Sequence, residues 1–129
     1  MELTPAPYFG EIADGPEGGA AHWVSCEDGL RIRVGHWLPQ DTAREAIKGT
    51  VLIFPGRTEY VEKYGPAAVD LGKRGFASLA SDWRGQGIAD RMLDDRLLGH
   101  VDHFPDFQRD AVAMDQPAEA RAWPTPRFL

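Results

Sequence analysis

Two glycine-containing loops, each directly after an apolar segment, are the parts of this sequence with the clearest potential for chemistry. They are 54–60 (Phe-Pro-Gly-Arg-Thr-Glu-Tyr) and 82–87 (Asp-Trp-Arg-Gly-Gln-Gly). Gly56 lacks a Cβ, so the chain can turn sharply there and direct the next amide, that of Arg57, toward the edge of a sheet. Such an amide can stabilise an oxyanion. A Pro-Gly pair alone is more often an ordinary tight turn, so the residues by themselves leave both interpretations open.

The second loop contains a Gly-x-Gly pair that resembles the start of a dinucleotide-binding fingerprint. Asp90 occupies the position of the third glycine, and no typical strand-to-helix transition follows. Neither loop ends in the Gly-Lys-Ser or Gly-Lys-Thr of a phosphate-binding P-loop. The sequence therefore predicts no nucleotide site and no cofactor.

A third group of side chains could bind a divalent metal. His100 and His103 lie close in sequence to Asp102, Asp106 and Asp110, and imidazoles and carboxylates are zinc ligands. A catalytic zinc needs three well-placed ligands with further support, and the sequence has no second His or Cys cluster to complete a site. We expect no metal, with a metallohydrolase as the less favoured alternative.

A thiolate pair of Cys26 with His22 is another candidate, because residues four apart on a strand face the same side. A lone cysteine in an apolar strand is usually inert core, and we favour that interpretation.

The apolar pattern predicts the elements that position these loops. Asp28-Gly29 between two short runs, 22–26 and 30–37, predicts a β-hairpin. Residues 50–54 are apolar without alternation and predict a strand buried on both faces.

A helix is predicted over 64–74, ending before Gly75, and a second buried strand over 76–80. Strand, helix and strand in succession are typical of a right-handed crossover, so the sheet should be at least partly parallel. The predicted fold class is α/β.

The rest of the chain is less regular. Prolines and glycines in residues 1–21 predict an extended amino-terminal arm, with a partial domain over 22–129. We expect a loop over 41–48 and an irregular charged segment over 88–101. A helix over 104–122 should be kinked or divided by Pro117, and 127–129 resembles the start of another strand.

Composition excludes several classes of protein. The chain has 129 residues, 43% of them hydrophobic and 26% charged, with a formal net charge of −6. These values are ordinary for a globular chain, and the acidic balance disfavours a nucleic-acid partner. Cys26 has no internal disulfide partner, and residues 1–5 do not resemble a signal peptide. No apolar stretch approaches the roughly 20 residues of a membrane span, so we expect a cytoplasmic protein, with peripheral contact with the inner membrane left open.

From Gly49 to Asp110 the chain resembles the amino-terminal half of an α/β-hydrolase of the serine aminopeptidase type. More narrowly, its motifs are similar to those of bacterial lysophospholipases related to monoacylglycerol lipases. Residues 88–90 depart from the Gly-x-Ser ending that is common in this family. The motifs concerned are Pro55-Gly56-Arg57 with Glu59 and Tyr64, Asp82 with Arg84-Gly85-Gln86-Gly87, and Gly99-His100-Val101 with Phe104 and Asp110.

The resemblance implies that the backbone N–H of Arg57 is one of two oxyanion-hole donors. It also implies that Asp82 holds its loop through backbone hydrogen bonds and is not the triad acid. Glu59 and Arg84 are either rim residues that support the Arg57 loop or solvated charges. The full set of expected loop-supporting residues is Gly56, Glu59, Asp82, Arg84, Gly85 and Gly87.

The sequence contains no Gly-x-Ser-x-Gly nucleophile motif, because Ser25, Ser78 and Ser81 lack flanking glycines. In the family the serine, the acid and the histidine of the triad would follow Leu129. We therefore expect an amino-terminal fragment of a serine carboxylic-ester hydrolase that is inactive alone, with a lipid or small ester as substrate and a carboxyl-terminal half as partner. The alternative is a truncated, non-catalytic protein or interaction module.

Overall fold

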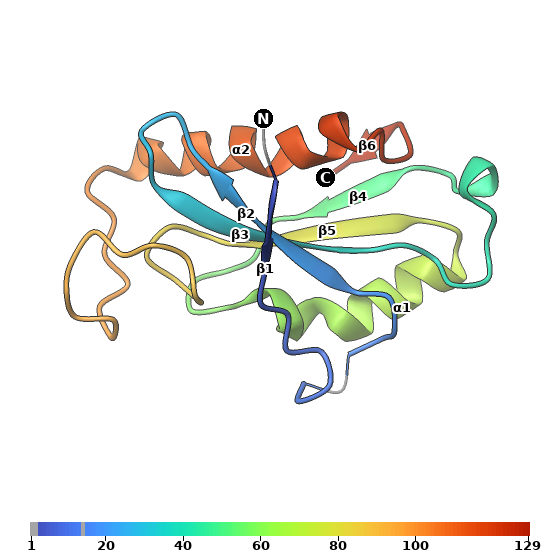
Figure 1. Ribbon diagram of the computed structural model, residues 1–129, viewed down its shortest axis with the longest axis horizontal. Helices are drawn as coiled ribbons and strands as arrows, with labels where there is room; N and C mark the ends of the chain where they lie inside the picture. The colour runs from blue at the N-terminus through green and yellow to red at the C-terminus, as the bar shows by residue number, and fades with distance from the viewer. Residues whose placement is uncertain (1–2, 14) are drawn as a thin grey trace.

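A single mixed sheet forms the centre of the molecule, with one long helix on each face (Figure 1). The computed structural model describes residues 3–13 and 15–129. The spatial strand order is β1-β2-β3-β5-β4-β6. The strands are β1 (Thr4–Ala6), β2 (Ala20–Ser25), β3 (Arg31–Trp37), β4 (Thr50–Ile53), β5 (Ala77–Asp82) and β6 (Arg127–Phe128).

The predicted hairpin is confirmed: β2 and β3 pair antiparallel, and Gly29 in the turn has a φ of +85°. Within the predicted arm, β1 adds to the outer edge of β2, also antiparallel. The predicted crossover is confirmed as well, because β4 and β5 are parallel and α1 (Gly65–Lys73) connects them. A 3₁₀ turn, η2 (Val61–Tyr64), leads into α1.

The expectation that both crossover strands are fully buried is correct for β5 and wrong for β4. All six residues of β5 are buried, whereas only Thr50 is buried in β4. The outer neighbour of β4 accounts for this difference in part, because Val51 pairs with β6 and is still only half-buried. β6 pairs with Thr50 and Val51 alone, so Leu52 and Ile53 have no strand beside them on that side within the described residues.

The carboxyl-terminal helix α2 spans Phe107–Ala120, after a 3₁₀ turn η3 at Phe104–Asp106. Pro117 lies inside α2, which continues through it, so the predicted division of the helix is wrong, while the alternative, a kink, stays a prediction. Pro117 is in the final turn of the helix, where its ring is fully buried. Another short 3₁₀ turn, η1 (Arg44–Ala46), lies within the predicted 41–48 loop.

Two apolar cores lie on the two faces of the sheet. On the α2 face, Ala113, Met114 and Ala118 pack against strand residues that include Ile32 and Leu79. On the α1 face, Ala68 and Val61 pack with Trp37 and Ala80. Among the described residues, no helix has the length and apolarity needed to cross a membrane.

Because β4 and β5 are parallel, their carboxyl ends lie at the same edge of the sheet. Loop 54–60 leaves β4 there, and the segment 83–103, which has neither helix nor strand, leaves β5. The fold therefore brings the two glycine-containing loops together.

Candidate active site

Two side chains of the second loop hold the first loop directly. The indole Nε1 of Trp83 donates to the carbonyl oxygen of Pro55 at 2.7 Å, and the Oε1 of Gln86 accepts from the Thr58 amide at 2.5 Å. The Trp83 ring also packs edge-on against Phe54, with centroids 5.3 Å apart. The sequence placed both residues in a motif, but nothing in the pattern indicated that their side chains join the two loops.

The Arg57 amide lies at the exposed turn of the first loop. In residues 3–13 and 15–129 it donates to no acceptor, while the Arg57 side chain donates from Nη2 to the Gly99 carbonyl at 3.0 Å. Thr58 has a φ of +66°, which is unusual for a β-branched residue and marks a strained turn. The bond to Gln86 and a bond from Thr58 Oγ1 to the Arg57 carbonyl hold this conformation. The loop thus presents a backbone N–H without an internal partner.

Glu59 lies beside the turn, with its side chain 23% exposed. It accepts a short hydrogen bond from the Tyr64 hydroxyl and lies 3.6 Å from Lys63 Nζ. The Tyr64 hydrogen bond and the Lys63 charge lower the pKa of Glu59, against the opposing effect of burial. A Cβ on Gly56 would lie 2.6 Å from Glu59 Oε1, so the absence of a side chain at Gly56 allows this carboxylate to approach the turn.

Asp82, the last residue of β5, is fully buried and uses both carboxylate oxygens. Oδ1 accepts from the amide of Val61, and Oδ2 accepts from the amide of Ile88, each at 2.9 Å. Arg33 Nε donates to Oδ2 at 2.8 Å. Gly87 has a φ of +53°, and a Cβ there would lie 2.2 Å from the Asp82 carboxyl carbon. Asp82 therefore anchors the backbone at both sides of the site.

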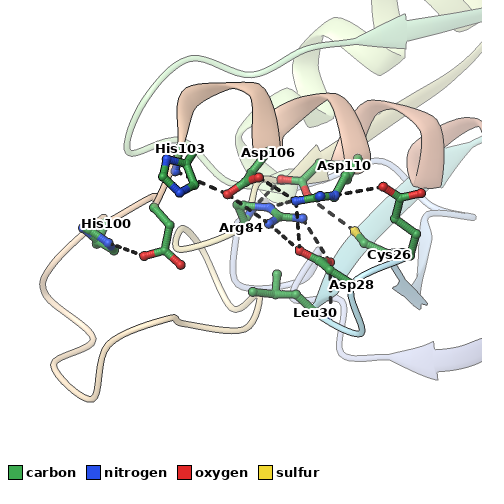
Figure 2. A network of polar contacts seen from close by, with 11 residues as sticks. Cys26, Asp28, Leu30, Arg84, His100, His103, Asp106 and Asp110 are labelled. Atoms are coloured by element: carbon green, nitrogen blue, oxygen red, sulfur yellow. Dashed lines mark hydrogen bonds and ion pairs between the residues drawn. The ribbon is translucent and has the colours of Figure 1, made fainter.

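The Arg84 side chain lies in a polar network between the hairpin turn and α2 (Figure 2). Its Nε donates to Asp110 Oδ1 at 2.8 Å, and its Nη1 donates to Asp28 Oδ2 at 2.9 Å. The Arg84 side chain is 3% exposed, so the solvated-charge interpretation is wrong for this residue. Burial acts to lower the pKa of Arg84, but the hydrogen bonds that Arg84 donates to Asp28 and Asp110 raise it overall.

The His and Asp residues considered for metal binding contact one another or Arg84. His100 Nε2 lies 2.7 Å from Asp102 Oδ1, and the His103 amide donates to Asp106 (Figure 2). Asp110 belongs to the Arg84 network. Within the described ranges, no three His, Cys, Asp or Glu side chains form a group that could hold a metal ion.

Gly85, the remaining predicted supporting residue, has a φ of +76° and passes close to the His100 carbonyl. Cys26 is buried, and its Sγ contacts Asp110 Oδ1 at 3.4 Å. Burial, together with the charge and hydrogen bond of Asp110, raises the pKa of Cys26 to about 12. His22 instead stacks on His36, so the structure does not bring Cys26 and His22 together as a thiolate pair.

Comparison with known proteins identifies the family. A model of a hydrolase family, described as serine aminopeptidase S33, matches residues 45–129. This chain belongs to that family.

Lysophospholipase L2 from Escherichia coli K12 is 47% identical to this chain over 66 residues. The matched region is 51% of this chain and 19% of that protein, so the chain spans only about a fifth of this relative. Lysophospholipase L2 from E. coli O6:H1 matches to the same extent.

Solved structures confirm the α/β-hydrolase fold. Est1E from Butyrivibrio proteoclasticus, with ferulic acid bound, aligns with a TM-score of 0.60 at 20% identity over 82% of this chain and 40% of that one. A soluble variant of monoglyceride lipase from Saccharomyces cerevisiae, in complex with a substrate analogue, aligns with a TM-score of 0.55 at 22% identity over 98% of this chain and 33% of that one. The resemblance to the amino-terminal part of an α/β-hydrolase, inferred from the motifs, is confirmed.

Proposed function

We propose that this chain forms the oxyanion side of a carboxylic-ester hydrolase whose substrate is a lipid ester, either a lysophospholipid or a monoacylglycerol. The observation that supports this most directly is the Arg57 amide, which has no internal acceptor within the described residues and lies on a loop fixed by Trp83 and Gln86. An amide held in this way can stabilise the developing negative charge without reorganising. The names of the matching lysophospholipases and lipase suggest the substrate class.

In the proposed reaction a nucleophile attacks the ester carbonyl and the carbonyl oxygen becomes negatively charged. The Arg57 N–H donates a hydrogen bond to that oxygen, and a second amide, next to the nucleophile, completes the oxyanion hole. The 129 residues contain no Gly-x-Ser-x-Gly motif. We therefore propose that this chain alone does not turn over esters and that a carboxyl-terminal partner segment supplies the nucleophile.

The donor is tested by a pair of substitutions at one position. Arg57→Pro removes the amide hydrogen, whereas Arg57→Ala keeps it and removes only the side chain. Both variants are made in a chimera that joins this chain to the corresponding carboxyl-terminal part of E. coli lysophospholipase L2, and p-nitrophenyl ester turnover is measured. We expect kcat to fall about 10²- to 10³-fold for Arg57→Pro and to change little for Arg57→Ala. Equal rates for the two variants would exclude the amide as a donor.

A second test concerns the chain alone. We expect p-nitrophenyl ester turnover by the isolated 129 residues to equal that of a heat-denatured control. Turnover above the control would contradict the proposed need for a partner segment. An interaction module without catalysis is the alternative. It is favoured by the side of β4 at Leu52 and Ile53, which has no strand beside it in residues 3–13 and 15–129, because an open strand edge can pair with another chain. That alternative predicts binding of a partner with no ester turnover in the chimera.

We also propose a cytoplasmic location, with peripheral contact with the inner membrane as the alternative. The free, buried Cys26 is compatible with a reducing compartment, and a net charge of −6 argues against simple electrostatic attachment to anionic lipid. Cell fractionation tests this location. A salt wash of the membrane fraction would release the chain if its contact with the membrane were electrostatic.

A further inference from the structure

The Arg33 guanidinium is the centre of a buried charged cluster on the α1 face of the sheet. Its side chain is 2% exposed. Nη1 and Nη2 donate to the two carboxylate oxygens of Glu62 at 2.6 and 2.7 Å, and Nε donates to Asp82 at 2.8 Å. Arg33 and Asp82 are directly opposed on β3 and β5. One guanidinium thus joins a strand, the 3₁₀ turn η2 and the start of the second loop.

The amino-terminal arm covers this cluster with backbone groups. Arg33 Nη1 donates to the Pro7 carbonyl at 3.0 Å, and the Phe9 amide donates to Glu62 Oε2 at 2.9 Å. Between them, the Tyr8 hydroxyl accepts from Trp37 Nε1 at 2.8 Å. Within the arm, Pro7 is therefore bound to Arg33 and Phe9 to Glu62.

The cluster also reaches both loops of the candidate site. Asp82 Oδ1 accepts from the amide of Val61, which follows loop 54–60, and Oδ2 accepts from the amide of Ile88, which follows loop 82–87. The Arg57 turn is thus held near its centre by Trp83 and Gln86 and at its far end by Asp82. A shift of Asp82 would move the backbone that follows each loop.

The charges in the cluster depend on one another. Burial acts to raise the pKa of Glu62, but the Arg33 hydrogen bonds and the Phe9 amide lower it overall. Burial acts to lower the pKa of Arg33, and the hydrogen bonds to Glu62 and Asp82 raise it overall. Removing one partner leaves an uncompensated buried charge, which is strongly destabilising. The arm, η2 and Asp82 therefore have one preferred arrangement.

We propose that Arg33 is a positioning residue that couples the amino-terminal arm, through Glu62 and Asp82, to the loop carrying the Arg57 amide. The catalytic importance of that amide rests on the proposed function, but the coupling does not. Deletion of the arm and replacement of Arg33 should therefore loosen the same loop.

Hydrogen exchange of the Thr58 amide, measured by NMR on the full 129-residue chain, reports the coupling because this amide donates to Gln86. The variants are Arg33→Lys, which cannot reach both carboxylates in the same geometry, Glu62→Gln, and a deletion of residues 1–9. Met114→Ala is the control, since Met114 is fully buried in the core on the opposite face. Urea unfolding of each variant gives the global stability for comparison.

We expect Thr58 exchange to accelerate at least tenfold in Arg33→Lys and Glu62→Gln, and in the same direction in the deletion, beyond the change in global stability. In Met114→Ala, Thr58 exchange should change by no more than about twofold beyond the change in global stability, because this substitution removes apolar packing without a polar link to the loops. Equal acceleration in Met114→Ala, or no acceleration in the variants that fold, would overturn the coupling. The assay needs no ester turnover, so a failure of the Arg57→Pro comparison would leave this result unchanged.

Discussion

Acidification from pH 7 to pH 5 should destabilise this protein through His36. His36 lies on the α2 face, stacked on His22 with centroids 5.6 Å apart and 4.5 Å from the Trp123 ring. The charged groups that face it are His22, from β2, and Arg121, from the end of α2. Burial, then the His22 and Arg121 charges, lowers the pKa of His36 from 6.5 to about 4.

The sign follows from proton binding. Between pH 6.5 and pH 4 the unfolded state binds more protons at His36 than the folded state, so stability falls as the pH falls through this window. For pKa values of 6.5 and about 4, the loss is about 2 kcal/mol between pH 7 and pH 5 and about 3 kcal/mol below pH 4. Burial also lowers the pKa of His22, which adds a loss of the same sign. The carboxylates with lowered pKa, such as Glu62, contribute mainly below their ordinary value of 4.5.

Urea unfolding followed by tryptophan fluorescence at pH 7 and pH 5 measures the effect. His36→Gln removes the titrating group and keeps a polar side chain, so its stability should change much less between the two pH values. NMR titration of the His36 ring protons gives the pKa directly. A wild-type loss below about 0.5 kcal/mol, or an equal loss in His36→Gln, would refute the reasoning.

Three further outcomes are expected. Gly87→Ala should lower the free energy of unfolding, measured with urea, by more than about 2 kcal/mol, because its Cβ would collide with the buried Asp82 carboxylate. Gly29 also has a positive φ but open space around it, so Gly29→Ala should lower the free energy of unfolding by about 1 kcal/mol in the same assay. Trp83→Phe should cost about 1 kcal/mol by removing the bond to Pro55 while keeping an aromatic ring; an unchanged urea midpoint would contradict that contact. Cys26, with its pKa raised to about 12 by burial and then Asp110, should react with a thiol reagent at pH 8 at least about 100-fold more slowly in the native protein than in urea.

Local patterns predicted the elements because the signals lie within a few residues of one another. Each of these signals determines the conformation of the backbone next to it, as do the Asp-Gly turn, the apolar run before Gly56 and the glycine after α1. The errors concern tertiary context. The burial of β4 depends in part on how far β6 pairs, and Pro117 is buried in the final turn of a continuous α2.

The polar contacts of the candidate site were much less predictable. Arg33 lies in an alternating strand, where its type suggests a solvent-facing side chain, yet it is buried. Its partners Glu62 and Asp82 are 29 and 49 residues away in sequence, and no periodic pattern relates them. The sequence predicted the loops. The side chains that hold them, which include Trp83 and Gln86, can be identified only from the structure.

Two buried arginines each bind more than one carboxylate. Arg33 binds Glu62 and Asp82 on the α1 face, and Arg84 binds Asp28 and Asp110 toward α2. Buried ion pairs are weak sources of stability, because desolvation offsets much of their attraction.

In this fold the carboxylates of these ion pairs also hold the backbone of the loops in place. Besides binding an arginine, Asp82 and Asp110 each accept hydrogen bonds from backbone amides. Asp82 accepts from Val61 and Ile88, and Asp110 accepts from Arg84. An apolar side chain of similar volume would fill the same space but could not accept those bonds. We therefore expect apolar replacement of Asp82 to leave buried amides without acceptors and to displace the loops even where the core remains packed. Unshifted NMR signals of the Val61 and Ile88 amides in Asp82→Leu would contradict this account.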